Sequence, residues 1–157
     1  MDKINKADTF NQGFETVEFL GSAIMDMRYH TVDPTNLDPR AFEKDELAKL
    51  GMPKEIPMRH RSTQFGHVFS SEGYAAGYYG YLWAEVLTAD AAEAFREAPG
   101  GLYDKKLAAS MVSNLFTVRN ATDPGDAYRA FRGRDATPDA LLRDRGFPVP
   151  TAGGGAQ

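Results

Sequence analysis

Apolar residues recur at helical spacing along most of this chain. Thr9 and Gln12 have the form of a capping box. The apolar positions that follow lie three or four residues apart: Phe10, Phe14, Val17, Leu20, Ile24 and Met27. This spacing predicts a helix over residues 9–29. A shorter helix is expected over residues 40–50, because Gly51 and Pro53 follow directly and would stop it.

The middle of the chain predicts a connector and then a long helix. Residues 54–71 carry the basic run RHR and little periodicity, so we expect an extended segment there. Residues 73–98 regain helical spacing. Gly77 and Gly80 lower the helix propensity of this second segment, at a cost of about 1 kcal/mol each relative to alanine.

The last third predicts three more helices. After the PGG break at 99–101, one helix is marked by four apolar positions: Leu107, Met111, Leu115 and Val118. Asp123 with Pro124, and Thr137 with Pro138, are capping pairs that would start two short helices. No segment alternates with period two for long enough to predict a strand. We therefore expect an all-α, irregular helical bundle, with residues 1–150 as one helical domain and 151–157 as a flexible tail.

Composition excludes several classes of function. The formal net charge is −4 and the basic residues are scattered, so nucleic acid is not an expected partner. There is no cysteine, which excludes disulfides and thiolate sites and fits a reducing compartment, so the cytoplasm is expected. The N-terminus lacks an apolar signal region, and no run approaches the roughly 20 apolar residues of a membrane span.

Most candidate chemistry is weak when taken residue by residue. His30, His60 and His67 do not form a His-x-x-x-His pair with an intervening Glu, so no zinc site built from this chain alone is expected. Ser70 and Ser71 lie near His67 only in sequence, and no Gly-x-Ser-x-Gly elbow is present, which sets a serine nucleophile aside.

Charged residues in the helices have ordinary interpretations. Glu15, Glu18 and Asp26 lie among apolar residues of the first predicted helix, and a solvated helix face is the favoured interpretation. The RGR at 132–134 could bind a carboxylate bidentately. A surface or interhelix ion pair is the favoured interpretation there too.

The stretch HVFSSEGYAAGYYGYLW, from His67 to Trp83, is more informative. On a continuous helix, spacings of four and three would place Tyr74, Tyr78 and Tyr81 within one narrow arc. A tyrosine hydroxyl needs a partner, which makes tyrosine a poor choice for a dry core, and the intervening glycines and alanines leave room for a ligand. A ligand face lined by tyrosines and an aromatic contact between helices both remain open. His67 could add a donor for an oxyanion.

Several stretches together carry a family resemblance. FGHVFSSEGYAAGYYGYLWAEVL at 65–87 resembles the substrate-binding segment of the thimet oligopeptidase and dipeptidyl carboxypeptidase family of zinc metallopeptidases, and most resembles its bacterial dipeptidyl carboxypeptidase branch. FNQGFETVEFL at 10–20, RHR-x-x-x-FGH at 59–67 and DPGDAYRAFRGRDATPDALLRDRGF at 123–147 are similar to the C-terminal part of the same family. The resemblance covers nearly the whole chain.

The resemblance implies a mostly helical peptidase in which zinc activates a water to attack a peptide carbonyl. By motif position it implies that Tyr81 and Tyr74 donate hydroxyls to the oxyanion or the scissile carbonyl. It implies that His67 contacts the substrate backbone and that Tyr78 also binds substrate. Short peptides would be the substrates, and the parent would release C-terminal dipeptides.

The zinc motif of that family, His-Glu-x-x-His with a downstream Glu, does not occur in these residues. One interpretation is that the chain is a C-terminal fragment of a zinc peptidase and supplies the His/Tyr wall of its substrate cleft. Its partner would be the missing N-terminal part, and the isolated fragment would self-associate. Zinc would then belong to the full-length parent, and the isolated chain would be inactive. The alternative is a stand-alone, non-catalytic helical module that binds peptides or a partner protein.

Overall fold

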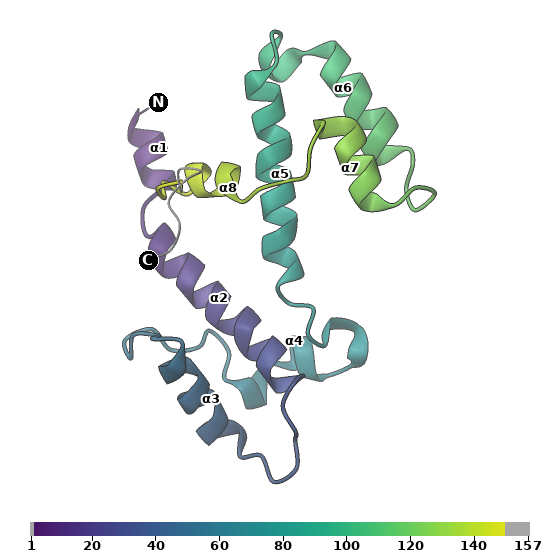
Figure 1. The fold of residues 1–157 in the computed structure, drawn as a ribbon. Coiled ribbons are helices and arrows are strands. Elements are labelled where there is room, and N and C mark those ends of the chain that lie inside the picture. The colour runs from purple at the N-terminus through teal and green to yellow at the C-terminus, as the bar shows by residue number, and fades with distance from the viewer. Residues whose placement is uncertain (1, 150–157) are drawn as a thin grey trace, which may run out of the picture. The chain divides into compact units, whose positions relative to one another are not determined.

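A computed structural model describes residues 2–149, and Figure 1 shows its helices. The α-helices and shorter helical turns are α1 (Asp2–Asp8), α2 (Gln12–Tyr29), α3 (Pro39–Lys49), η1 (Ser62–Gln64), α4 (Gly66–Phe69), η2 (Glu72–Tyr74), α5 (Gly80–Glu97), η3 (Gly101–Tyr103), α6 (Lys105–Met111), the π-helical turn η4 (Val112–Phe116), α7 (Pro124–Arg132) and α8 (Asp139–Asp144). No strand occurs within residues 2–149, so the all-α prediction is confirmed. No helix in this described part is long and apolar enough to cross a membrane.

The chain divides into two compact units, Met1–Leu82 and Trp83–Gln157, and the division falls inside α5. The expectation of one helical domain over residues 1–150 stays a prediction. The expected flexible tail, 151–157, lies outside the described residues.

Aspartate caps explain where three of the helices begin. The Asp38 carboxylate accepts hydrogen bonds from two backbone amides of the first turn of α3, at 2.8 and 3.1 Å. The Asp123 carboxylate does the same for α7, at 2.9 and 3.1 Å, and proline opens both helices. Asp104 caps α6 by accepting from the Leu107 amide at 2.9 Å. The predicted starts near Arg40 and Asp123 are therefore confirmed.

Three predicted elements differ from the structure. The helix expected from residue 9 begins at Gln12, because the chain turns at Asn11, whose φ is +64° and whose side chain makes no cap hydrogen bond. The segment 54–71 is not simply extended, since it contains η1 and α4. The helix expected from residue 73 begins at Gly80, and a turn precedes it.

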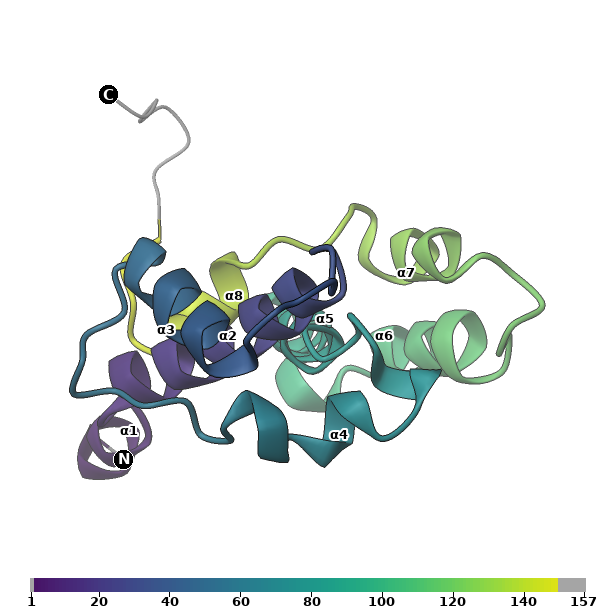
Figure 2. The same ribbon diagram turned by 90° about the horizontal axis from the view of Figure 1, so that it is seen from below.

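In the first unit, α2 packs against α3, as Figures 1 and 2 both show. Met25 of α2 and Val68 of α4 are each only 1% exposed. The buried side of α2 differs from the predicted apolar face, since Phe14, Val17 and Met27 of α2 are all exposed, as is Phe10 just before the helix. The side that packs inside the unit is instead Gly21, Ser22, Ala23, Met25 and Asp26.

In the second unit, α5 packs against α6, η4 and α7. Ala91, Ala94 and Phe131 are buried together, and four partly buried apolar residues surround them: Phe95, Leu107, Met111 and Leu115. α7 is amphipathic and buries Ala127, Tyr128 and Phe131. This packing matches the predicted helical spacing of the last third.

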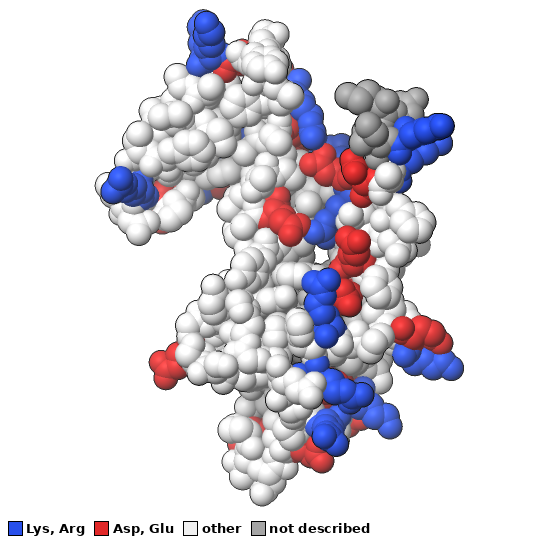
Figure 3. All heavy atoms as spheres, turned by 180° about the vertical axis from the view of Figure 1, so that it is seen from behind, with Lys and Arg blue, Asp and Glu red and all other residues white. Residues whose placement is uncertain are grey.

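A buried aspartate in α5 organises the charged residues of the second unit. Asp90 is 0% exposed and accepts hydrogen bonds from the Tyr128 hydroxyl at 2.7 Å, Arg134 at 2.5 Å and Arg132 at 3.3 Å. Arg132 also makes a bidentate pair with Glu97, at 2.8 and 3.1 Å. The favoured interpretation of the RGR segment as an interhelix ion pair is confirmed. On the face drawn in Figure 3, acidic and basic side chains lie beside one another.

We expect the Asp90 cluster to make the chain sensitive to acid. Burial alone would raise the pKa of Asp90, but hydrogen bonds from Tyr128 and Arg134 and the charges of both arginines outweigh it, so the pKa is lowered. A lowered pKa contributes stability that is present above the unfolded-state pKa and lost as pH falls through the folded-state pKa. Urea unfolding midpoints should fall between about pH 5 and about pH 2. They should fall less steeply in an Asp90→Asn variant, and equal slopes would contradict this assignment.

Candidate functional site

The candidate site begins with His67, which α4 presents at the surface of the first unit. The residues on either side of it anchor this short helix, because Phe65 is 6% and Val68 is 1% exposed. His67 itself is exposed. The buried Phe65 and Val68 therefore anchor α4, and the His67 imidazole is exposed to solvent.

Tyr81 lies at the start of α5, opposite His67. The His67 Nε2 and Tyr81 hydroxyl oxygen are 3.1 Å apart, which is a hydrogen bond whose donor depends on the imidazole tautomer. The Tyr74 ring lies over the imidazole, with ring centroids 4.3 Å apart. Tyr74 and Tyr81 are nearly parallel, with centroids 6.1 Å apart and 8° between their planes. Three polar rings thus meet on one exposed surface.

Tyr78 forms the base of this cluster and not its exposed edge. Its ring stacks on Phe19 of α2 at 5.0 Å and meets Phe65 edge to face, also at 5.0 Å. It also contacts Tyr81 at 5.6 Å. Because Phe19 and Phe65 pack against Tyr78, its ring is fixed and supports the Tyr81 ring that it contacts.

The electrostatics of the cluster keep Tyr81 protonated. A hydrogen bond with Tyr74 raises the pKa of Tyr81, and partial desolvation and the nearby Tyr74 and Tyr78 phenols raise it further. A phenol whose pKa lies above its ordinary value remains an O–H donor at neutral pH. Tyr74 and Tyr81 are each 43% exposed, so both side chains lie at the surface of the first unit.

The structure brings together all four residues that the sequence singled out, but by a different local geometry. Tyr74 ends η2, Tyr78 lies in the turn that follows, and only Tyr81 is in α5. The prediction that one continuous helix places the three tyrosines on one face is therefore wrong. The rings converge because the turn folds back toward α4.

One residue that positions this turn was assigned to the wrong environment by sequence. Asp26 of α2 was expected on a solvated face, yet it is 2% exposed and its carboxylate accepts hydrogen bonds from the Ala76 and Tyr78 amides. The available signal was its place between Met25 and Met27, close to the aromatic Tyr29. By contrast, Glu18 forms an ion pair with Arg59 at 3.4 Å, and Glu15 is exposed.

The described residues do not fit a resident zinc ion. Within residues 2–149, no three His, Asp or Glu side chains gather into a group able to hold a metal. His67 is surrounded by phenols and not by further ligands. None of these described residues is therefore proposed as a metal ligand.

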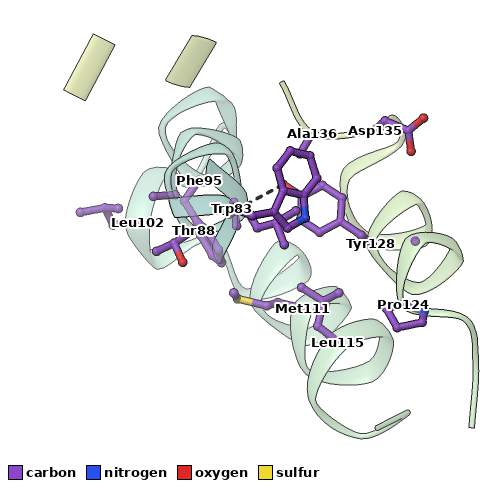
Figure 4. Close-up of a pocket in the computed structure, with 14 residues that line it drawn as sticks. Trp83, Thr88, Phe95, Leu102, Met111, Leu115, Pro124, Tyr128, Asp135 and Ala136 are labelled. Atoms are coloured by element: carbon purple, nitrogen blue, oxygen red, sulfur yellow. Dashed lines mark hydrogen bonds between the residues drawn. The ribbon is translucent and has the colours of Figure 1, made fainter. Parts of the chain in front are cut away.

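The second unit has a separate apolar cavity of about 850 Å³. Figure 4 shows Trp83, Phe95 and Met111 lining it, together with Tyr128 of α7. The Tyr128 hydroxyl is already engaged by Asp90, and burial followed by that hydrogen bond raises the pKa of Tyr128. The cavity wall is therefore hydrophobic in character, and the polar rings of the first unit remain the better candidate for chemistry.

Comparison with known proteins identifies the family. Residues 1–147 match Peptidase family M3. The chain belongs to Peptidase family M3. M3 peptidases are zinc metallopeptidases, so the family resemblance seen in the sequence is confirmed.

Curated M3 relatives match almost the whole chain. A dipeptidyl carboxypeptidase of Salmonella typhimurium is 36% identical over 150 residues, which are 93% of this chain and 22% of that protein. An oligopeptidase A of Haemophilus influenzae is 35% identical over 152 residues, which are 94% of this chain and 21% of that protein. This chain thus spans about a fifth of the length of the M3 relatives that it matches.

Proposed function

We propose that this chain forms the part of a zinc-dependent M3 oligopeptidase that binds the peptide backbone and stabilises the oxyanion. The observation that carries the proposal is the convergence of His67, Tyr74 and Tyr81 on one exposed surface, with the imidazole and the Tyr81 hydroxyl 3.1 Å apart. Donors held in place before the reaction stabilise a developing negative charge without further reorganisation.

Within this proposal the two exposed phenols have the chemical role. Tyr81 and Tyr74 donate their O–H groups to the oxygen of the scissile carbonyl, and these bonds shorten as that oxygen becomes an oxyanion. Both phenols can donate at neutral pH, because a tyrosine hydroxyl is protonated there. His67 binds the substrate backbone beside them, and Tyr78 binds substrate at the base of the cluster.

The substrates proposed are short peptides from which C-terminal dipeptides are released. This assignment is supported by the similarity to a dipeptidyl carboxypeptidase over 93% of the chain. The zinc ligands are proposed to lie elsewhere in the full protein, whose remaining part is the expected structural partner. A cytoplasmic location is proposed on the absence of cysteine.

A stand-alone binding module is the second candidate function. The observation in its favour is the apolar cavity of the second unit, which could accept a side chain of a partner protein. The two candidates differ in whether the Tyr81 hydroxyl matters for peptide turnover.

We expect the purified 157-residue chain to hydrolyse no peptide, with or without added zinc. The reason is that residues 2–149 offer no cluster of metal ligands. Release of a dipeptide from a short fluorogenic peptide and zinc binding by calorimetry would be measured. Turnover abolished by a chelator, or stoichiometric tight zinc binding, would contradict this expectation.

The proposed function itself is tested in a chimera. The matching segment of the Salmonella typhimurium dipeptidyl carboxypeptidase would be replaced by residues 1–147 of this chain. The chimera should release C-terminal dipeptides, and its activity should depend on Tyr81. A folded chimera that is inactive, or one whose activity is unchanged by Tyr81→Phe, would contradict the proposal.

A further inference from the structure

The carboxylate of Asp26 binds the backbone of the turn that carries the candidate site. Its Oδ1 accepts from the Ala76 amide and its Oδ2 from the Tyr78 amide, both at 3.0 Å. The two elements are about fifty residues apart in sequence, and the carboxylate is buried. A buried, charged acceptor shared by two amides of one turn is a strong restraint on that turn.

The turn needs such a restraint, because its own conformation is unfavourable. Ala76 has φ +55°, in the left-handed region that an alanine rarely adopts. Residues held in such conformations persist only where their surroundings fix them. The amide of Ala76 itself donates to Asp26, so the carboxylate acts on the residue that carries the strain.

The same carboxylate is connected to α4, which carries His67. The His30 Nδ1 lies 2.9 Å from Asp26 Oδ1 and 2.7 Å from the Asp26 carbonyl oxygen. The His30 ring stacks on Phe69 of α4, with centroids 5.6 Å apart. The end of α2 therefore touches the turn before α5 and also α4, which are two of the elements that carry the cluster.

We infer that Asp26 is a positioning residue for the tyrosine cluster, acting through the backbone of residues 75–79 and not by touching substrate. Its carboxylate fixes the turn so that Tyr74 and Tyr78 meet Tyr81 and His67. The functional half of this inference rests on the proposed function. The structural half stands on the two amide hydrogen bonds alone.

The structural half is tested on the 157-residue chain by amide hydrogen exchange. In the wild-type chain the Ala76 and Tyr78 amides should be protected, and in Asp26→Asn at least one of them should lose protection and shift upfield. An Asn side chain can accept from one amide, but it presents an NH₂ group to the other. Glu15→Gln removes the same charge from an exposed position of α2 and should leave both amides unchanged. Unprotected amides in the folded wild-type chain would overturn the inference without any variant.

The functional half is tested by a double-mutant cycle in the chimera. Asp26→Asn should lower kcat/KM by about 10- to 100-fold, because small displacements of positioned groups have effects of this size. If Asp26 acts through the phenols, the double variant Asp26→Asn/Tyr81→Phe should lose much less kcat/KM than the product of the two single losses. Multiplicative effects would show that Asp26 acts only on general stability and would overturn its positioning role.

The two tests separate failure of this inference from failure of the proposed function. If Tyr81→Phe has no effect in an active chimera, the proposed function fails, while the exchange experiment still decides whether Asp26 holds the turn. If Tyr81→Phe is harmful and Asp26→Asn is not, the proposed function stands and the inference about Asp26 is wrong.

Discussion

Tyr81→Phe should lower kcat of the chimeric peptidase by about 10²- to 10³-fold, which is the usual effect of removing one oxyanion donor. KM should change much less, because the hydrogen bond to the carbonyl oxygen strengthens mainly in the transition state. The substitution removes one hydroxyl and keeps the ring, so the packing of Tyr81 against Tyr74 and Tyr78 is retained. Steady-state kinetics with a peptide that releases a C-terminal dipeptide provide the measurement.

The matched control is Tyr79→Phe in the same turn. Tyr79 is 54% exposed and precedes α5 by one residue, and it is proposed for no role in the cluster. It should lose little activity. If Tyr81→Phe raised KM and left kcat unchanged, Tyr81 would be a ground-state binding residue and its assignment as an oxyanion donor would be wrong.

Asp90→Ala should destabilise the chain by about 3–5 kcal/mol, because it removes the buried partner of two arginines. Arg132 is 9% exposed at its side chain and keeps only Glu97, while Arg134 is 42% exposed and can turn to water, which favours the lower end of this range. The Tyr128 hydroxyl also loses its carboxylate acceptor. The free energy of unfolding in urea is the measurement.

Asp144→Ala is the matched control for this prediction. Asp144 pairs with Arg96 at 2.8 Å, and both side chains are more than a third exposed. An exposed pair of this kind contributes about 0–1 kcal/mol. Equal destabilisation by the two substitutions would show that burial of Asp90 does not govern its contribution.

Local signals in the sequence predicted much of the fold. Asp38 with Pro39 and Asp123 with Pro124 start helices because a carboxylate beside a proline satisfies free amides in the first turn, and this is a property of adjacent residues. Gly133 and Gly146 both have positive φ just past a helix, as expected of glycine there. Two other local signals failed: Thr9 with Gln12 and Thr137 with Pro138 were expected to cap helices, but α2 begins at Gln12 after Asn11, and α8 begins at Asp139 with no side-chain cap from its N-cap residue Pro138.

Predictions that depended on distant partners failed. Spacing alone favoured one helix from residue 73, but Asp26 binds the Ala76 and Tyr78 amides and holds the chain in a turn up to Gly80. Sequence spacing cannot show a hydrogen bond between residues about fifty positions apart. The buried side of α2 was missed for the same reason, since its polar residue Asp26 faces inward while Phe10 and Phe14 are exposed.

The four residues that the sequence singled out lie close together, but the helical geometry expected for them was wrong. His67, Tyr74, Tyr78 and Tyr81 do lie together, but a turn and a short helix bring them there. The chemical argument, that tyrosine hydroxyls need partners, did not depend on the helix. It therefore stays a prediction that does not depend on the helical stripe.

The most direct test of the central claim is the affinity of the chimera for a phosphonate peptide, which mimics the tetrahedral intermediate. A transition-state analogue should lose affinity in parallel with kcat/KM when an oxyanion donor is removed. For Tyr81→Phe and Tyr74→Phe we predict that phosphonate binding weakens by about the same factor as kcat/KM, while Tyr79→Phe changes neither. Phosphonate affinity that is unchanged in Tyr81→Phe, despite a large loss of kcat/KM, would contradict the account.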